Sequence, residues 1–562
     1  MADNSPVQGG EPGQFGMTRR EWVKYFGATG LAAGLAGCGG DGGSGGDGGS
    51  GGDGGSGGDG GSGGDGGSGG DGSSGPQYSF PIEDEDAFSD VELRWTTDNS
   101  AGPLYAMFGP IIEEETNITF NDGKTLPASN YYSSLNTELI GGGDVPYDIV
   151  LNIPLYLGDF QARGLFEPLD DYIAQYEGAQ EYLDGVIEPY KEFYMKFNGN
   201  TVAIPIDGDI HNLFYRPSFF QDEKHQEAYQ DEYGQELRPP ETWPEFNQVA
   251  KYFTENTEDG TFGTQVFGAR PWNFGWFMDR AASRGVIYFD EEMEPQINSD
   301  DAVTALEHMV ESIQYAPEGS AQFGIAETIN QWQQGNVVMT PWWIDLSEFT
   351  ARGDFPVVGD QRSKAMPGWE QDDGSIRRNA MMLYNRLYSI PADLPQERKD
   401  AAFYAIHRLA RTPIHEQATA DPFTGLDPSH EMHYTEEAAE LYTKPNPLRE
   451  TGEGFPENPP IFSPDTDYVG GISAQEQAQQ HLDAGRTNME NGFPQPQWPG
   501  SSQYTEDFAI HIQRALVGEE SPQEALDNVA DKWRQTVEEL GRESQMEHYN
   551  RFLDKAKKLG YV

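Results

Sequence analysis

The chain has 562 residues, of which 93 are acidic and 36 are basic, so its formal net charge is −57. Such a charge destabilises a compact fold by self-repulsion in dilute buffer. At molar salt the repulsion is screened, because the Debye length is only about 3 Å. We therefore expect a protein adapted to high salt. Nucleic acid is excluded as a partner because the sequence contains no cluster of basic residues. A disordered acidic chain is excluded because 12% aromatic and 36% hydrophobic residues are enough to form packed cores.

The first 37 residues have the pattern of an export signal. Arg19 and Arg20 precede an apolar run over residues 25–36 that is too short to cross a bilayer as a helix. This pattern resembles the twin-arginine signal of proteins that fold before export. The Leu-Ala-Gly sequence before Cys38 resembles a lipobox, and Cys38 is the single cysteine of the chain. We therefore expect cleavage after residue 37 and a lipid on Cys38.

Residues 38–76 are predicted to form a tether. After Cys38 they repeat the sequence Gly-Gly-Asp-Gly-Gly-Ser. A glycine-rich coil of this length reaches roughly 30 to 35 Å. We therefore expect the folded body, from residue 77 onward, to lie at the extracellular face of the cell membrane, held there by the lipid.

Beyond residue 90, short apolar runs alternate with longer amphipathic stretches, which predicts an α/β fold. Strands are expected at residues 91–96, 147–151 and 201–206. Two helices are expected to begin in capping boxes, one from Thr242 to Glu245 and one from Ser521 to Glu524. The second of these helices has an apolar face that is expected to pack in the core, formed by Leu526, Val529, Ala530, Trp533, Val537 and Leu540.

The chain lacks the common catalytic motifs. Residues 123–125 read Gly-Lys-Thr, like the end of a phosphate-binding loop, but Ile118 stands where the first glycine of that loop belongs. There is no paired-histidine zinc motif and no nucleophile elbow, and the single cysteine is assigned to lipidation. We expect no catalytic residue, cofactor or metal ion, although the many acidic residues leave a carboxylate-based glycosidase open.

Six blocks along the chain resemble, in order and spacing, the extracellular solute-binding proteins of carbohydrate ABC importers, the family 1 proteins that are similar to maltose-binding protein. The blocks are residues 147–152, 163–169, 202–216, 241–246, 334–343 and 515–526. With the acidic composition and the lipobox, the chain resembles the haloarchaeal lipoproteins of this class.

The resemblance implies an α/β fold of the two-lobe periplasmic-binding-protein type (type II), in which crossover strands join the lobes and the ligand lies in the cleft between them. The implied boundaries are 77–205 and 351–435 for the first lobe, and 206–350 and 436–562 for the second lobe with the C-terminal helices. Such a protein captures a sugar-like solute, closes its lobes and delivers the solute to permease subunits that act with ATPase subunits.

The resemblance also suggests polar and aromatic ligand contacts, which are Asp98, Asn99, Asn152, Asp207, Asp209, His211, Trp272, Trp276, Trp342 and Trp343. Each has a structural alternative. For the residues that follow strands the alternative is a solvated loop or a cap, for Asp207 and His211 it is stabilisation of the crossover turn, and for the tryptophans it is packing in the core. Residues 421–430 are a further segment that could reach the ligand.

Two other functions stay open from the sequence. Within transport, the solute could be an oligopeptide or a glycerol phosphate, and a basic pocket would favour the latter. From a different class, a tethered surface hydrolase of polysaccharides requires two carboxyl groups about 5 to 10 Å apart across a groove.

Overall fold

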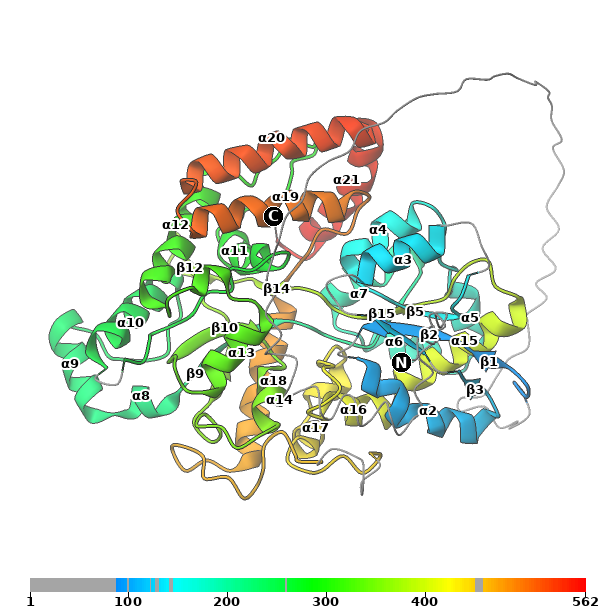
Figure 1. Cartoon of the computed structure of the whole chain (residues 1–562), viewed down its shortest axis with the longest axis horizontal. Coiled ribbons are helices and arrows are strands. Elements are labelled where there is room, and N and C mark those ends of the chain that lie inside the picture. Colours follow the sequence, from blue (N-terminus) through cyan, green and yellow to red (C-terminus); the bar gives the residue numbers. More distant parts are fainter. Residues whose placement is uncertain are drawn as a thin grey trace, which may run out of the picture.

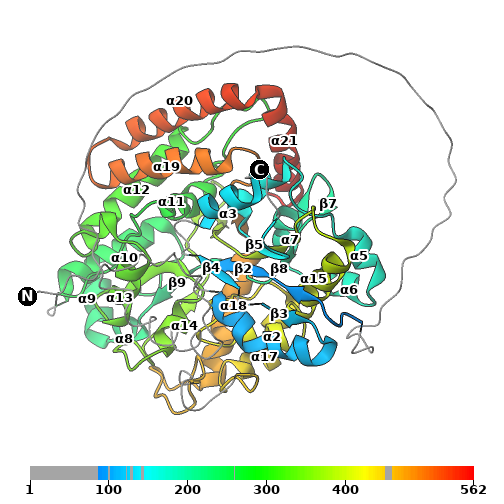
Figure 2. The same ribbon diagram turned by 45° about the vertical axis from the view of Figure 1, so that its right-hand side comes forward.

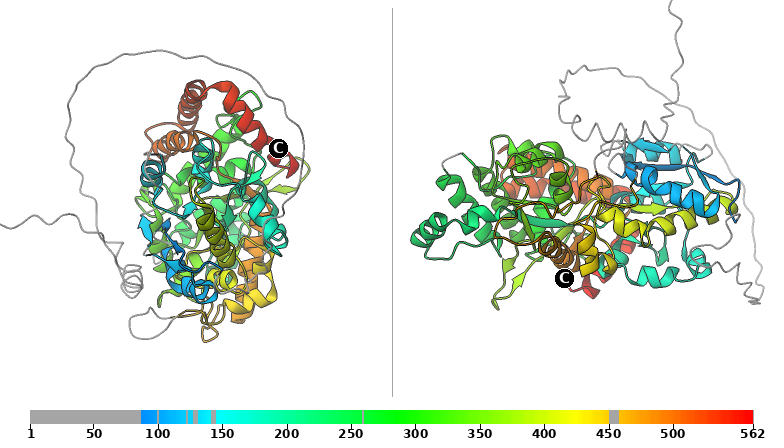
Figure 3. Two further views of the ribbon diagram at one scale, coloured as in Figure 1. Left: turned by 90° about the vertical axis from the view of Figure 1, so that its right-hand side faces the viewer. Right: turned by 90° about the horizontal axis from the view of Figure 1, so that it is seen from below.

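The computed structural model describes residues 87–98, 101–121, 123–126, 131–140, 145–257, 260–449 and 458–561. The expected export signal, Cys38 and the tether lie outside these residues. In the described part of the chain, no helix combines the length and the apolar character needed to cross a bilayer. Two α/β lobes lie at opposite ends of the long axis of the molecule, as Figure 1 and the view from below in Figure 3 show.

The first lobe is built on a five-stranded sheet in the order β4-β2-β5-β15-β8. The strands are β2 (Trp95–Asp98), β4 (Lys124–Leu126), β5 (Ile149–Asn152), β8 (Ile204–Pro205) and β15 (Leu387–Ser389). β2 runs parallel to β4 and β5, whereas β15 runs antiparallel to β5 and β8. Figure 2 shows this sheet with β4, β2, β5 and β8 beside one another. The strands expected near residues 91, 147 and 201 are thus present, with shifted or divided bounds.

Helices cover both faces of this sheet. They are α2 (Gly102–Thr116), α3 (Tyr131–Ile140), α4 (Pro154–Gln161), α5 (Asp170–Gln175), α6 (Ala179–Asp184), α7 (Glu188–Tyr194), α15 (Gln396–Leu409) and α16 (Ile414–Thr419). Buried apolar residues of β5, including Ile149 and Leu151, supply the centre of the core. Short strand pairs flank the lobe: β1 (Glu92–Leu93) with β3 (Thr119–Phe120), and β6 (Lys196–Phe197) with β7 (Asn200–Thr201).

The second lobe contains an antiparallel sheet in the order β10-β9-β11. Its strands are β9 (His211–Tyr215), β10 (Met339–Trp343) and β11 (Arg362–Lys364). Its helices are α8 (Pro217–Gln221), α9 (Glu223–Tyr233), α10 (Trp243–Asn256), α11 (Asn273–Ala282), α12 (Asp300–Ser312), α13 (Ile325–Gln333) and α14 (Leu346–Ala351). The sequence assigned residues 351–435 to the first lobe, but β11 pairs with β9 and so belongs to the second. The chain returns to the first sheet only at β15.

Two segments connect the sheets. Residues 206–210 lead from β8 to β9, and residues 383–386 lead from β14 (Ala380–Met382) to β15. β14 pairs in parallel with β16 (Gly492–Pro494), and a hairpin of β12 (Trp369–Glu370) and β13 (Ile376–Arg377) precedes it. Both connecting segments are buried.

The C-terminal helices pack on both lobes. They are α17 (Glu436–Leu441), α18 (Ala474–Glu490), α19 (Ser501–Leu516), α20 (Pro522–Leu540) and α21 (Arg542–Lys558). α18 lies on β9 and β11, and α19 contacts α11 and α4. A Cβ on Gly158 of α4 would lie 2.5 Å from the backbone oxygen of Gln497, so only glycine allows the chain before α19 to approach this closely.

The expected helix starts are present. Thr242 and Glu245 form a reciprocal capping box at α10, and Ser521 caps α20 by accepting a hydrogen bond from the N–H of Glu524. The expected apolar face of α20 is buried as far as Val537. Leu540 is 41% exposed, because the helix ends there and its last turn extends beyond the core.

Candidate functional site

Polar side chains meet at the end of the first sheet that faces the second lobe. Asp98 is the last residue of β2, and Asn152 is the last residue of β5. Because these strands are parallel and Thr96 pairs with Val150, Asp98 and Asn152 lie level at the same edge. This is the edge at which open α/β sheets bind ligands.

Arg386 joins this edge to the crossover segment. Its Nε–H donates to Asp98 Oδ2 at 2.8 Å, and its Nη1 donates to Asp207 Oδ2 and lies 3.4 Å from Asp209 Oδ2. The hydroxyl of Tyr384 also donates to Asp98 Oδ2, at 2.8 Å. All these side chains are buried, so one guanidinium links three carboxylates that come from two parts of the chain.

Asp427 completes the group of buried carboxylates. Its backbone N–H donates to Asp207 Oδ1 at 2.7 Å, and its backbone oxygen accepts from the N–H of Gly208 at 2.9 Å. The side chain of Asp427 is 2% exposed. We call Asp98, Asp207, Asp209, Arg386 and Asp427 the interlobe cluster.

Burial favours the protonated form of three carboxyl groups of the cluster, because it raises the pKa of Asp207, Asp209 and Asp427. Burial raises the pKa of Asp207, and the charge of Arg386 opposes this rise. Burial, with the neighbouring charge of Asp207, raises the pKa of Asp209 well above its usual range. Burial and the charge of Asp345 do the same for the pKa of Asp427. Burial on its own would lower the pKa of Arg386, but the three aspartates outweigh it and raise that pKa.

Several buried polar atoms around the cluster have no hydrogen-bond partner among the described residues. They include both side-chain amide atoms of Asn152, both of Asn385, and the indole Nε1 of Trp342. Asn385 adjoins the cluster directly, because its backbone N–H donates to Asp209 Oδ2 at 3.1 Å. Buried polar groups are normally paired, so unpaired ones at an interlobe surface indicate a place where a polar ligand supplies the partners.

Three of the residues suggested by the sequence lie instead in the aromatic core of the second lobe. The ring of Trp276 stacks on Phe267 at 4.1 Å, and its Nε1–H donates to the backbone oxygen of Pro341. Trp343 donates to the backbone oxygen of Leu383 at 2.9 Å. His211 Nδ1 lies 2.8 Å from Asp279 Oδ2. Trp276 and Trp343 thus bond within the protein, as does His211 through Nδ1, whereas His211 Nε2 has no partner among the described residues.

Trp272 lies closer to the cluster. Its ring packs edge-on against Tyr384, with the centroids 5.0 Å apart, and Tyr384 in turn hydrogen-bonds Asp98. Trp342 has its ring among Phe267 and Trp276, while its Nε1 has no partner in the described part of the chain. Asn99 lies outside the described residues.

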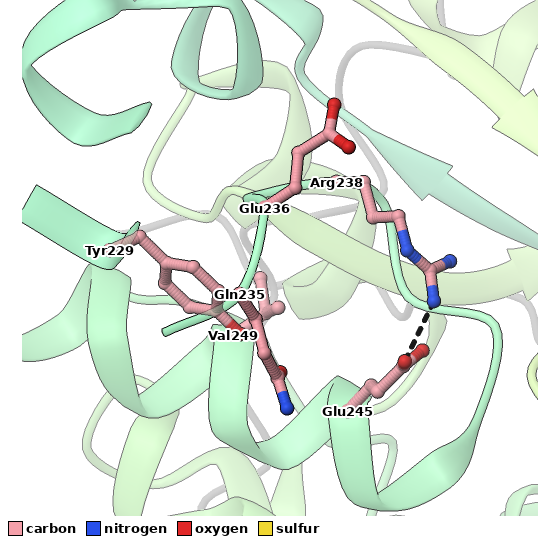
Figure 4. Close-up of a pocket in the computed structure, with 6 residues that line it drawn as sticks. All are labelled: Tyr229, Gln235, Glu236, Arg238, Glu245 and Val249. Carbon is pink, nitrogen blue, oxygen red and sulfur yellow. Dashed lines mark hydrogen bonds and ion pairs between the residues drawn. The ribbon is translucent and has the colours of Figure 1, made fainter. Parts of the chain in front are cut away.

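Two hollows on the surface lie away from the interlobe cluster. The one in Figure 4 is beside α9 and α10 and is lined by Tyr229, Gln235, Glu236, Arg238, Glu245 and Val249. Two of its charged groups are already paired with each other, since Arg238 Nη2 lies 2.7 Å from Glu245 Oε1. A second hollow lies between α19 and α20, around Gln503 and Lys532. Neither is lined by a residue that the sequence suggested.

The sequence analysis missed Tyr384, Asn385 and Arg386. A signal was present, because Arg386 is the one charged residue within the otherwise uncharged run of residues 379–391. A charge in such a run is expected to be buried and paired. Its partners could not be read from the sequence, since Asp98 precedes it by 288 residues.

Solved structures share this architecture. A solute-binding protein of Agrobacterium radiobacter K84 in complex with ribitol aligns with a TM-score of 0.60 at 18% identity, over 80% of this chain and 99% of that chain. Maltose-bound MalE3 of T. maritima aligns with a TM-score of 0.60 at 18% identity, over 79% and 100%. A solute-binding protein of Agrobacterium vitis S4 with D-mannitol gives 0.57 at 16%, over 80% and 99%. These alignments confirm the two-lobe binding-protein fold.

The sequence of the chain also matches a protein family. The model of the family described as bacterial extracellular solute-binding protein matches residues 99–404. This range begins directly after Asp98 and includes both connecting segments with Asp207, Asp209 and Arg386, whereas Asp427 lies beyond it. Because the match covers more than half of the chain, this protein belongs to the family of bacterial extracellular solute-binding proteins.

Proposed function

We propose that this protein captures a sugar or sugar-like solute between its lobes and delivers it to the permease of an ABC importer. One observation carries the proposal: buried polar side chains without partners line the interlobe edge on both sides. Asn152 belongs to the first lobe, Trp342 to the second, and Asn385 to the segment between them. The role is binding, with no catalytic residue assigned.

The chemistry of these groups fits a polyhydroxyl solute. An amide such as that of Asn152 both donates and accepts hydrogen bonds, as a sugar hydroxyl does. A buried group left unpaired costs about 1 to 3 kcal/mol, so a solute that pairs several of them favours the closed arrangement of the lobes. Trp272 packs against Tyr384 of the cluster region, and Trp342 has an unpaired indole nitrogen among the described residues, so these are the two rings that we assign to contact with a sugar ring.

The solved relatives support this class of solute. Their structures hold ribitol, maltose and D-mannitol, three molecules with many hydroxyl groups and no charge. A glycerol phosphate fits less well, because the interlobe cluster has four carboxylates and one guanidinium and would repel a phosphate. An oligopeptide with a free amine stays as the alternative that the negative cluster allows.

The proposal extends to the place where the protein works. The twin arginines Arg19 and Arg20, the lipobox before Cys38 and the glycine-rich repeat support export in a folded form and a lipid anchor at the extracellular face of the membrane. The tether then gives the lobes room to meet the permease. The charge of −57 supports work in concentrated salt.

The test is the melting temperature of the full-length protein in molar KCl with ribitol, mannitol, maltose, a tripeptide or glycerol phosphate. A solute that binds only the folded protein, at a hundred times its dissociation constant, adds about 2.7 kcal/mol of stability. We expect a sugar or polyol to raise the melting temperature and to be recovered unchanged. A response to the tripeptide or the phosphate alone, or a cleaved sugar, would overturn the proposal.

The variant Asn152→Ala locates the site. We expect it to bind the solute at least about tenfold more weakly, since the loss of one or more hydrogen bonds is worth about 1.4 kcal/mol or more. Asn200→Ala, on the exposed strand β7, is the matched control and should bind as the wild type does. Equal binding by all three proteins would place the solute elsewhere.

A further inference from the structure

Three carboxylates of the interlobe cluster converge on one point. One carboxylate oxygen each of Asp207, Asp209 and Asp427 lies within 4.8 Å of the others, and all three residues are buried. Oxygen ligands of a calcium ion stand about 2.3 to 2.6 Å from it, so oxygens around one ion lie at most about 5 Å apart. The spacing of these three oxygens therefore suits a single divalent cation.

The backbone holds this group in place. Gly208, between the first two aspartates, donates its N–H to the backbone oxygen of Asp427, and Asp427 donates its own N–H to Asp207 Oδ1. A Cβ on Gly208 would lie 2.1 Å from the backbone oxygen of Pro428, so only glycine allows this contact. The two segments are therefore fixed against each other by their backbones, independently of any ligand.

Asp427 provides a second, independent indication of a ligand. Its side chain is 2% exposed, and its Oδ2 has no hydrogen-bond partner in the described part of the chain. The backbone N–H of Asn385 donates to Asp209, and the side-chain oxygen of Asn385 is likewise buried without a partner among the described residues. Carboxylate and amide oxygens are the ligands that calcium and magnesium prefer.

The charges of the cluster leave room for a cation. Arg386 forms ion pairs with Asp98, Asp207 and Asp209, whereas Asp427 has no ion pair within the described residues. Ionised, the four carboxylates and one guanidinium sum to three negative charges in a buried space. A buried charge without a counter-charge is costly, and a divalent cation would remove most of the excess.

We propose that Asp207, Asp209 and Asp427 bind a divalent metal cation, with oxygen ligands of the kind that calcium selects. The ion neutralises the base of the interlobe space and fixes the segment 206–210 against the segment that contains Asp427. This inference goes beyond the capture of a solute, because the ion binds to the protein with no solute present.

The experiment uses the full-length protein, treated with EDTA and dialysed into molar KCl, and measures calcium binding by calorimetry together with the melting temperature. We expect one saturable site per chain and a higher melting temperature with millimolar calcium.

In Asp427→Asn, calcium should bind at least about tenfold more weakly. In EDTA this variant should melt at or above the wild-type temperature, because it replaces a buried carboxyl group, whose ionised form is unfavourable there, with a neutral amide. A merely structural role for Asp427 predicts the opposite change in EDTA.

The control separates this site from the acidic surface. Asp465→Asn changes an exposed aspartate and should leave the saturable binding unchanged. If Asp427→Asn does not fold, Asp209→Asn takes its place and is judged by calcium binding alone, because Asp209 also pairs with Arg386. Absence of a saturable site for calcium, magnesium and manganese in the wild type overturns the proposal, as does binding that the variants at the cluster leave intact. The solute panel is measured separately, so the two proposals fail independently.

Discussion

Arg386 is enclosed by acidic groups, and this position gives it a different role from that of a surface arginine. It donates to Asp98 at the end of β2 and to Asp207 in the crossover segment, so it joins the first sheet to the chain that leaves for the second lobe. Removing one partner of a buried ion pair costs about 3 to 5 kcal/mol, because the other partner is left without a counter-charge. The main role of Arg386 is therefore to fix the first sheet against the crossover segment, and its net contribution to the free energy of unfolding is small.

Buried histidines make the stability of the protein dependent on pH. Burial lowers the pKa of His481 to about 3, and it lowers the pKa of His308 to about 3 and of His415 to about 4. His481 lies in α18 with its Nδ1 2.9 Å from Ser363 Oγ. A histidine with a lowered pKa stabilises the fold fully above its unfolded pKa of 6.5, and this stabilisation is lost as the pH falls below that value.

We expect His481→Gln to reduce this dependence. Between pH 7 and pH 5 the wild type should lose about 2 kcal/mol of unfolding free energy through His481 alone, since each pH unit below the unfolded pKa costs about 1.4 kcal/mol. The glutamine variant lacks this loss, so its urea midpoint should fall less over the same range. Above pH 7 the two curves should run parallel. Parallel curves below pH 6 as well would show that His481 titrates normally.

At the scale of elements, the start of α10 depends on its capping box. Thr242 Oγ1 accepts from the N–H of Glu245 at 3.3 Å, and Glu245 Oε2 accepts from the N–H of Thr242 at 3.2 Å. Thr242→Ala removes the first of these bonds and should cost about 1 kcal/mol of unfolding free energy, measured by urea denaturation.

The control for this helix is Thr137→Ala on α3. Thr137 is exposed inside a helix and donates to the backbone oxygen of Ser133 at 2.8 Å, so it caps nothing. Alanine has the higher helix propensity there, and we expect no loss of stability. Equal losses in both variants would mean that the cap contributes nothing specific.

The local helices and strands could be predicted from the sequence, but the contacts of the interlobe cluster could not. The starts of α10 and α20 and the core strand β5 follow from short patterns of residues, and the family resemblance supplied the two lobes. The same resemblance suggested Asp98, Asn152, Asp207 and Asp209, with Asn152 also favoured by its place at the end of a strand. Asp427 was included only within a broad segment, and no metal ion was expected, because Asp427 meets Asp207 across 220 residues of chain. Such long-range contacts depend on the packing of the lobes, which short patterns do not encode.

At the scale of the whole molecule, surface charge opposes folding unless salt is present. The ion pairs of this protein use most of its few basic residues, and many acidic side chains stay exposed without a partner. On α9, Glu227 and Asp231 are exposed four residues apart, and like charges at this spacing repel each other. Asp231 also lies in the last turn, where a negative charge opposes the helix dipole.

We therefore expect the urea midpoint of the wild type to rise with KCl up to molar concentration, as the Debye length falls from about 10 Å at 0.1 M to about 3 Å at 1 M. The variant Glu227→Gln/Asp231→Asn should be more stable than the wild type in dilute buffer and equal to it in molar salt, because screening removes the repulsion that the substitutions remove. If the urea midpoints of the two proteins differ by the same amount at all salt concentrations, the gain comes from local helix propensity. Charge repulsion would then not explain why the protein needs salt.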